Sequence, residues 1–248
     1  MTLQNFFQQH KKIALAFSGG ADSAYLLYEG VRAGCNIHAY YVKSAFQPQF
    51  ELDDARKLAF ELNAQLTILE LDVLSDSQII KNPANRCYYC KRKIFEKIKE
   101  AAFADGFELL IDGTNASDDA ADRPGMKALQ ELQIRSPLRE YGITKEELRR
   151  RSKEAGLFTW DKPAYACLAT RIPTGEEITS KKLQTTEFSE KVLSDLGFTD
   201  FRIRLSGNAA RIQVREEQLE MLLLYRRNII EKLKPHYSAV TADLEVRS

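Results

Sequence analysis

Apolar segments with the length of strands alternate with amphipathic segments along the first part of the chain. Strands are predicted at 13–17, at a run ending with Tyr41 and Val42, at 66–71 and at 108–112. Between them, the helical spacing of apolar residues predicts helices at 22–33, 49–63 and 91–104. Strands that alternate with helices are typical of α/β proteins. We therefore expect a doubly wound parallel sheet.

The pattern changes after about Pro173. The predicted elements from there on are a helix at 180–196, a hairpin around Ser206-Gly207-Asn208, a helix at 216–233 and a strand at 237–244. This order predicts a small α+β domain at the C-terminus. We place the division between a first domain at 1–175 and a second at 176–248.

One helix of the first domain carries its own start and stop signals. Thr144 and Glu147 form a T-x-x-E capping box, and Gly156 ends the helix. Its three consecutive arginines, 149–151, are assigned to the solvent-facing side.

A run of small residues, "AFSGGADS", follows the first predicted strand. In a parallel sheet such a turn lies at the carboxyl edge, where the next helix points its N-terminus at a ligand. Gly19 and Gly20 allow backbone N–H groups to approach a phosphate. Ser18 and Ser23 add hydroxyl donors. Asp22 falls in the first helical turn, where it caps the helix or helps to hold Mg2+. The alternative is a tight turn that binds nothing.

Composition and charge exclude several classes of protein. The chain has 248 residues, an apolar fraction of 44% and a net charge of +1. Proteins that wrap nucleic acid usually carry a clear basic excess, so we expect no nucleic-acid partner. The sequence has no run of about 18 apolar residues for a membrane span and no signal-peptide pattern at its start. We expect a cytoplasmic protein with reduced cysteines.

The four cysteines form an incomplete metal-binding pattern. Cys87 and Cys90 form C-x-x-C at the start of a predicted helix, and Cys167 stands alone in "PAYACLATR". Three thiolates suit a 4Fe–4S cluster with one open iron, which can hold an added sulfide. A redox or persulfide relay, a zinc site with a further ligand and inert buried thiols stay open. We assign Cys35 to the core.

The glycine-rich turn resembles the SGGxDS signature of the PP-loop ATP pyrophosphatases. Further segments extend the resemblance over most of the chain: "RCYYCKRKIF", "IDGTNASDDAADRPGMKAL", "SPLREYGITKEELR", "WDKPAYACLATRIPTG" and "FRIRLSGNAARIQV". Together they are similar to the LarE family of sulfur transferases, which help to build the nickel-pincer nucleotide cofactor. The resemblance implies a homo-oligomer whose partners include the nickel-insertion and carboxylation enzymes of the same pathway.

The resemblance also implies a reaction on a small-molecule nucleotide, a pyridinium dicarboxylate mononucleotide. ATP adenylates one carboxylate and releases pyrophosphate, and sulfur then displaces AMP to give a thiocarboxylate. A second round converts the other carboxylate. Some family members surrender the sulfur of one cysteine, whereas others use three cysteines and a 4Fe–4S cluster. Cys87, Cys90 and Cys167 place this sequence with the second kind, and Cys167 is the key thiol under either mechanism.

Site residues are assigned from the strand edges and from the resemblance. The expected ATP and pyrophosphate site comprises Ala16, Ser18, Gly19, Gly20, Asp22, Ser23, Ser44 and Gly113. Adenylation and Mg2+ are assigned to Asp22, Asp112 and Asn115, although the last two also fit a helix cap and turn. The substrate phosphate is assigned to Arg202, Arg204, Arg211 and Arg123, whose alternative is an exposed arginine face.

Gln213 is a departure from the family pattern, because an acidic residue is expected there. This weakens the assignment of the substrate and leaves the assignment of ATP untouched.

Three alternative functions use the same motifs differently. A tRNA-thiolating PP-loop enzyme also uses three cysteines, but it needs a surface that binds RNA. An amide-forming ligase of the NAD synthetase type has no use for the three cysteines. A non-catalytic nucleotide-binding protein releases no pyrophosphate.

Overall fold

The computed structural model describes residues 2–118 and 124–247, which form two compact units. The first unit comprises Met1–Asp72 and Asn85–Lys162, and the second comprises Val73–Ala84 and Pro163–Ser248. Residues 163–175 therefore group with the C-terminal part of the chain, together with an excursion from the middle of the sequence. The division at 175 stays a prediction about independently folding domains. None of the helices formed by the described residues is long and apolar enough to cross a membrane.

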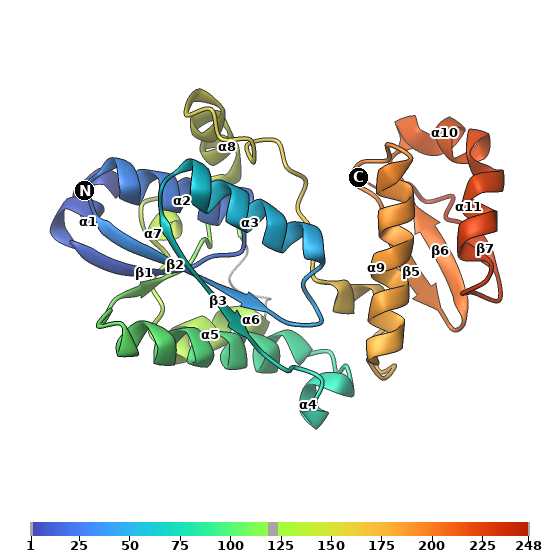
Figure 1. Cartoon of the computed structure of the whole chain (residues 1–248), viewed down its shortest axis with the longest axis horizontal. Helices are drawn as coiled ribbons and strands as arrows, with labels where there is room; N and C mark the ends of the chain where they lie inside the picture. The colour runs from blue at the N-terminus through green and yellow to red at the C-terminus, as the bar shows by residue number, and fades with distance from the viewer. Residues whose placement is uncertain (1, 119–123, 248) are drawn as a thin grey trace. The chain divides into compact units, whose positions relative to one another are not determined.

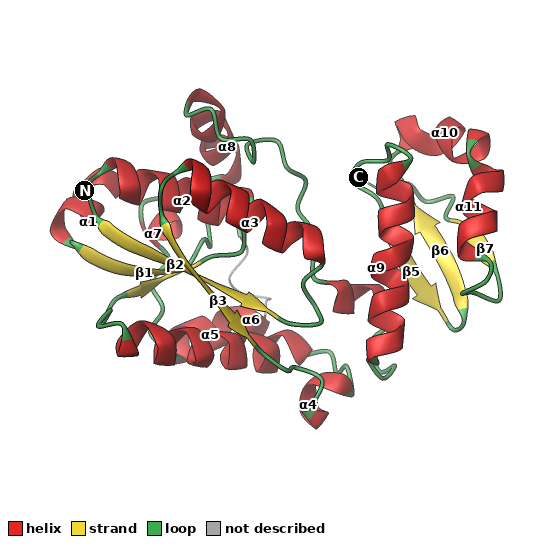
Figure 2. Cartoon of the chain, viewed as in Figure 1, coloured by secondary structure: helices red, strands yellow, loops and turns green. Residues whose placement is uncertain are grey.

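The first unit is built on a parallel sheet, as the alternation of strands and helices predicts. The sheet has the order β3-β2-β1-β4, with β1 (Lys12–Ala16), β2 (Asn36–Lys43), β3 (Gln65–Glu70) and β4 (Leu110–Ile111). Helices α2 (Ala21–Arg32) and α3 (Gln49–Glu61) cover one face, and α5 (Arg86–Ala104) and α6 (Pro124–Glu131) cover the other (Figures 1 and 2). This is the doubly wound α/β arrangement expected from the sequence.

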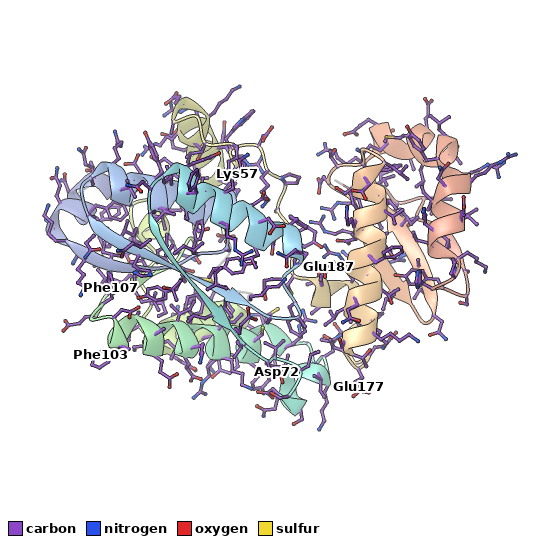
Figure 3. The ribbon with its side chains drawn as sticks, viewed as in Figure 1. Lys57, Asp72, Phe103, Phe107, Glu177 and Glu187 are labelled. Carbon is purple, nitrogen blue, oxygen red and sulfur yellow. The ribbon has the colours of Figure 1, made fainter. Side chains whose placement is uncertain are left out.

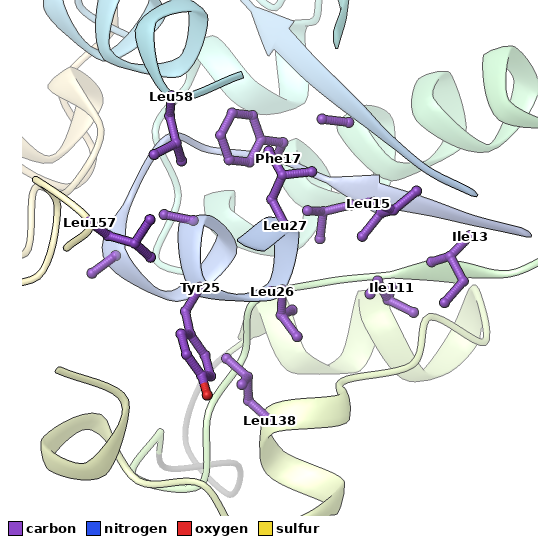
Figure 4. Close-up of a cluster of buried hydrophobic side chains, with 14 of the residues drawn as sticks. Ile13, Leu15, Phe17, Tyr25, Leu26, Leu27, Leu58, Ile111, Leu138 and Leu157 are labelled. Carbon is purple, nitrogen blue, oxygen red and sulfur yellow. The ribbon is translucent and has the colours of Figure 1, made fainter. Parts of the chain in front are cut away.

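Both faces of β1 are buried, which explains why 13–16 is an unbroken apolar run. Ile13 and Leu15 face the cluster that includes α2 residues Leu26 and Leu27 (Figure 4). Ala14 faces the opposite cluster, on the side of α5. A strand covered on both sides loses the polar alternation of a half-exposed strand.

Helix α5 begins earlier than expected. Near its C-terminal end, one phenylalanine is exposed and the next is buried. The helix starts at Arg86 rather than at 91, so Cys87 lies in its first turn and Cys90 at the start of its second. Phe103 near its end is 73% exposed, whereas Phe107 beyond the helix is buried beside the sheet (Figure 3). The extra turn is supported by α6, because the Tyr88 hydroxyl donates to Glu131 at 2.6 Å. This tertiary contact is absent from the local sequence pattern.

Several short helices were not expected from the sequence. They are α1 (Leu3–Gln9), α4 (Ser77–Ile80), α6 (Pro124–Glu131) and α7 (Pro137–Glu140). The capping box at the start of α8 (Lys145–Glu154) is confirmed, since the Thr144 hydroxyl accepts from the backbone N–H of Glu147 at 3.3 Å.

The second unit contains the expected hairpin and one further strand. Strands β5 (Arg202–Ser206) and β6 (Ala209–Gln213) are antiparallel, and β7 (Val240–Ala242) pairs parallel to β6. Gly207 in the turn has a φ of 56°, a conformation that favours glycine. Helix α9 (Ser180–Asp195) is as predicted. The helix expected at 216–233 is instead divided by Tyr225 into α10 (Leu219–Leu224) and α11 (Arg226–Leu233), after a 3-10 turn.

The excursion at 73–84 is held inside the second unit by Asn82. This asparagine is 1% exposed and has a φ of 52°, in the left-handed region. Its side-chain amide donates to the carbonyls of Ile172 at 3.2 Å and Pro173 at 2.7 Å. Its own carbonyl accepts from Gly175 at 2.8 Å. Asparagine is one of the few residues that both tolerates this backbone and supplies an amide donor.

Replacing Asn82 should loosen the excursion selectively. Asn82→Gly keeps the permitted backbone and removes both side-chain bonds, which should lower local stability by about 1–3 kcal/mol. The Ile178 N–H also bonds the excursion, at the Ile80 carbonyl. Hydrogen exchange at the Gly175 and Ile178 amides should therefore become about tenfold faster or more. Asn63→Gly is the matched control, because Asn63 also has a positive φ, 48°, at the end of α3. Equal protection in the two variants would contradict the role of the Asn82 amide.

Candidate functional site

The order of the strands places one edge of the first sheet at a topological switch point. The chain moves outward from β1 to β2 and β3 and then returns to the other side of β1 with β4. In such sheets ligands bind outside the carboxyl ends of the strands, where the winding direction reverses. The segments that leave this edge are 17–20 after β1, which we call the glycine loop, Ser44 after β2, and 112–118 after β4.

The glycine loop is braced by its two serines. The Ser18 backbone N–H donates to the Ser23 hydroxyl at 3.2 Å, and the two hydroxyls lie 3.1 Å apart. The Ser23 hydroxyl donates in turn to the Gly20 carbonyl at 3.3 Å. Ser23 is 2% exposed, whereas Ser18 is exposed. Ser23 therefore shapes the loop from within, and Ser18 presents its hydroxyl to solvent.

The glycines of this edge lie where a Cβ has little room. Gly19 has a φ of 70°, and a Cβ there would lie 3.1 Å from the Glu51 carbonyl oxygen. A Cβ on Gly113 would lie 3.0 Å from the Ser23 nitrogen. Gly20 is the N-cap of α2 and gives its first turn no side-chain cap. The N–H groups at the start of α2 thus remain available for an anion, which is the cradle that phosphate requires.

Asp22 is the point at which three elements meet. It lies in the first turn of α2, and its carboxylate accepts from the Asn115 amide at 3.3 Å. The Lys145 ammonium at the start of α8 donates to the other oxygen at 2.6 Å. Sequence reasoning assigned Asp22 and Asn115 to one site, and the structure brings them together. It missed Lys145, which could have been noticed because a cation is unfavourable at the N-terminus of a helix.

Asp112 is engaged on both of its oxygens. It is 6% exposed and accepts from the Thr114 hydroxyl at 2.5 Å and from the Ser136 hydroxyl at 2.6 Å. These hydrogen bonds stabilise the turn after β4. Its expected part in adenylation or Mg2+ binding stays a prediction.

Two further residues assigned to ATP lie at the same edge. Ala16 ends β1 opposite Tyr40 of β2. Ser44 follows β2, is 6% exposed and donates its hydroxyl to the Gln47 side chain at 2.7 Å. Arg123, assigned to the substrate phosphate, lies outside the described residues.

The three candidate thiols are divided between the two units. Cys87 is exposed and Cys90 is half-buried near the start of α5, and Cys167 is half-buried at the N-cap of the 3-10 helix Leu168–Arg171. Over residues 2–118 and 124–247, no group of three or more His, Cys, Asp or Glu side chains is gathered so that it can hold a metal ion. Cys87 and Cys90, one helical turn apart, fit two ligands of a shared soft metal centre by type and spacing.

The segment that carries Cys167 is fixed by a buried carboxylate. Glu190 of α9 accepts from Arg171 Nε at 2.6 Å, from the Tyr165 hydroxyl at 2.5 Å and from the Ile203 backbone N–H at 3.1 Å. Arg171 also donates to the Ala166 carbonyl at 3.1 Å, next to Cys167. Arg171 is 1% exposed, so the pair is sealed from solvent. Sequence reasoning missed both charges, although Glu190 occupies an inward position of α9 between Leu183 and Leu193.

Arg202 and Arg204 lie beside this network with few carboxylate partners. Arg202 donates to the carbonyls of Phe201 and Ala164, and Arg204 donates to the Thr170 carbonyl at 3.0 Å. Burial and the charges of Arg171 and Arg247 lower the pKa of Arg202 to about 10. Burial and neighbouring arginines lower the pKa of Arg204 as well. Arg202 is 5% exposed and also lies 3.8 Å from Asp200 Oδ1. Arg204 donates to neutral oxygen atoms, of Thr170 and of Gln213, so it keeps the greater affinity for an anion.

Gln213 links this cluster to Asp243 near the C-terminus. Its side-chain oxygen accepts from Arg204 Nε at 2.6 Å, and its nitrogen donates to Asp243 Oδ2 at 2.7 Å. The hairpin sets Arg211 opposite Arg204, and Arg211 Nε lies 3.4 Å from the same carboxylate oxygen. The hydrogen bond from Gln213, followed by the smaller influence of nearby arginines, lowers the pKa of Asp243. Gln213 therefore connects Arg204 to the carboxylate of Asp243 through its side-chain amide.

Cys35 has the contacts of a core residue. It is 8% exposed, and its thiol donates to the His10 carbonyl at 3.1 Å. Burial raises the pKa of Cys35 to about 11, because a thiolate is costly away from water.

Cys35 should consequently be inert in the folded protein. Its thiol stays protonated at all pH values well below its raised pKa, and thiolate is the reactive form. At pH 8 a maleimide should label Cys87 at least about a hundredfold faster than Cys35, as read by peptide mass spectrometry. Unfolding in urea should abolish the difference. Rapid labelling of Cys35 in the folded chain would show that the thiol is accessible after all.

Comparison with known proteins identifies the family, although no protein-family profile matches the chain. The chain is 37% identical over 224 residues to an uncharacterized protein of Synechocystis sp., and the aligned region covers 89% of this chain and 83% of that protein. It is 31% identical over 246 residues to the pyridinium-3,5-bisthiocarboxylic acid mononucleotide synthase of Lactiplantibacillus plantarum, covering 98% and 89% of the two chains. A more distant similarity, 22% over 188 residues, links 59% of the chain to 52% of the tRNA-specific 2-thiouridylase MnmA of Thermotoga petrophila. The chain thus belongs to the LarE family of ATP-dependent sulfurtransferases, within the PP-loop superfamily.

Proposed function

We propose that this protein converts the carboxylates of a pyridinium dicarboxylate mononucleotide to thiocarboxylates, as a step toward the nickel-pincer cofactor. The observation that carries the proposal is the 31% identity to the mononucleotide synthase over 98% of the chain. Nearly all of both units is included in that similarity. A shared ATP-binding unit alone would support only the use of ATP.

Adenylation gives the reaction its leaving group. The substrate carboxylate attacks the α-phosphorus of ATP, and the bond to the β-phosphate oxygen breaks to release pyrophosphate. A sulfur nucleophile then adds to the acyl carbon, and AMP leaves with the electrons of the broken C–O bond. The glycine loop, the N–H groups at the start of α2 and the Ser18 hydroxyl are the groups proposed to hold the phosphates. Asp22, with Asn115 beside it, is proposed to face Mg2+.

The three thiols are proposed as the sulfur-delivering site. Cys87, Cys90 and Cys167 would hold a 4Fe–4S cluster, which when bound would deliver an added sulfide from its open iron. The donors fit in type, since each is a thiol with some solvent exposure. The sacrificial route, in which Cys167 gives up its own sulfur, is the competing mechanism.

The arginine cluster is proposed to bind the phosphate of the mononucleotide. Arg204 donates to neutral oxygen atoms, so its charge is the one proposed to be available to a dianion, with Arg202 buried on the same strand. Glu190 fixes Arg171 and the Cys167 segment beside them. The substrate phosphate would therefore be bound next to the thiol segment of the same unit, which orients the pyridinium ring.

We also propose a cytoplasmic homo-oligomer that works beside enzymes of carboxylation and nickel insertion. Leu223 and Leu224 on α10 are 69% and 76% exposed, and Ile230 on α11 is 47% exposed. Apolar residues gathered on neighbouring helices are typical of contact surfaces.

Thiolation of tRNA is the second candidate, favoured by the similarity to the tRNA thiouridylase. It requires a basic surface, and the net charge of the chain is only +1. Tight tRNA binding at low salt, together with thiolation of the bound tRNA, would establish this function in place of the first.

Variants in the two units should separate the two half-reactions. Asp22→Ala and Ser23→Ala should lose AMP formation from the dicarboxylate mononucleotide, by about a hundredfold or more, because they disrupt the phosphate site. Cys167→Ala should form no thiocarboxylate while ATP binding stays within about twofold of the natural chain. Cys35→Ala is the matched control and should form both AMP and the thiocarboxylate. Thiocarboxylate formation by Cys167→Ala would remove that thiol from the mechanism.

The form of the sulfur donor is tested by metal analysis after anaerobic purification. Binding of the proposed cluster requires about four iron and four sulfide per chain, with loss of both in Cys87→Ser, Cys90→Ser or Cys167→Ser. Cys35→Ser should retain them. No iron after reconstitution, together with loss of one sulfur atom from Cys167 per turnover by mass spectrometry, would establish the sacrificial route.

A further inference from the structure

Lys145 occupies a helix position that is unfavourable for a cation. It is the first residue of α8, directly after the N-cap Thr144. The N-terminus of a helix carries partial positive charge, so acids such as Glu146 and Glu147 are the usual residues there. A lysine at this position needs a separate electrostatic reason.

The start of α8 is fastened to the same turn that bears Asn115. The backbone N–H of Lys145 donates to the Ser117 hydroxyl at 2.9 Å, and the Ala116 N–H donates to the Ile143 carbonyl at 2.9 Å. These bonds fix the Cα of Lys145 close to the switch point of the sheet. The side chain then extends to Asp22 on the first turn of α2, with 2.6 Å between Nζ and Oδ2.

The ion pair between Lys145 and Asp22 is only partly shielded from water. The two side chains are 30% and 27% exposed. Solvent-exposed pairs contribute little to stability, so this one can be exchanged at small cost for a partner of higher charge. By contrast, Arg171 and Glu190 are 1% and 7% exposed, and that pair is not available for exchange.

We propose that Lys145 is a pyrophosphate-binding residue, which Asp22 holds in place until a nucleotide occupies the glycine loop. Its ammonium then leaves Asp22 for an oxygen of the β- or γ-phosphate, and the Asp22 carboxylate is left to Asn115 and to Mg2+. A lysine acts as a mobile point charge for phosphate, which suits such an exchange. The inference rests on the proposed use of ATP. It adds Lys145 to the phosphate site, with Asp22 and phosphate competing for its ammonium group.

The exchange gives Asp22 opposite effects with and without metal. With Mg2+ present, the carboxylate supports phosphate binding. Without metal, it repels phosphate and competes with it for Lys145, so its neutralisation should strengthen binding. A residue that only stabilises the fold would show no such reversal.

The experiment measures the binding of inorganic pyrophosphate to the full chain by calorimetry, in Mg2+ and in EDTA. Lys145→Met should weaken binding about tenfold or more in both conditions, and Lys145→Arg should recover most of the loss. Lys153→Met is the matched control, because it removes an exposed lysine from the last turn of the same helix, and it should change binding less than about twofold. Asp22→Asn should tighten binding in EDTA by about tenfold, and adding Lys145→Met should remove that gain. AMP is the control ligand, and its affinity should be unchanged in Lys145→Met.

The outcomes separate this inference from the proposed function. If the natural chain binds neither pyrophosphate nor ATP in Mg2+, the proposed adenylation fails and the role of Lys145 fails with it. If the natural chain and Lys145→Met bind pyrophosphate equally, only the role of Lys145 is overturned. If Asp22→Asn does not bind pyrophosphate more tightly in EDTA, the proposed exchange of partners is overturned. This variant tests the exchange without altering Lys145.

Discussion

The parallel register of β1 between β2 and β4 is the constraint on which the chemistry of the first unit depends. Ala16 pairs with Tyr40 on one side, and Leu15 pairs with Ile111 on the other. All three strands therefore end at one edge, and each contributes its following segment there. Because the winding reverses between β1 and β4, the helices on the two sides leave this edge uncovered. The approach of Asn115 to Asp22 is a direct consequence of that register.

In the second unit, a buried carboxylate fixes the segment that carries the candidate thiol. Glu190 receives donors from the segment before Cys167, from Arg171 after it and from the backbone of β5. Removing one partner of a buried ion pair usually costs about 3–5 kcal/mol, so the network is energetically important. Its geometry also has a chemical consequence, because it fixes the chain on both sides of Cys167.

The first unit could largely be predicted from the sequence, since its elements are set by local pattern. The strands, the capping box of α8 and the glycine loop follow from periodicity and from residue type. The early start of α5 could not be predicted, because it depends on the contact between Tyr88 and Glu131 of α6. The excursion at 73–84 depends on Asn82, whose carbonyl partners lie far away in the sequence. Within the candidate sites, glycines and cysteines were visible as motifs, whereas Lys145, Arg171 and Glu190 act through partners that only the fold brings together.

In the proposed reaction, the two units would use different means to attract an anion, and the difference fits what each anion would have to do. In the first unit, neutral N–H groups and a lysine already paired with Asp22 leave little net charge at the glycine loop. Such a site can bind a polyphosphate and still release it as pyrophosphate after each turnover. In the second unit, Arg202 is held by carbonyl oxygens and lies 3.8 Å from Asp200, whereas Arg204 is held by neutral oxygen atoms. A permanently charged site suits a phosphate that takes no part in bond breaking and has to stay bound through two successive rounds. The near-neutral charge of the whole chain is therefore compatible with two anionic ligands, since the charge is concentrated where it does not need to change.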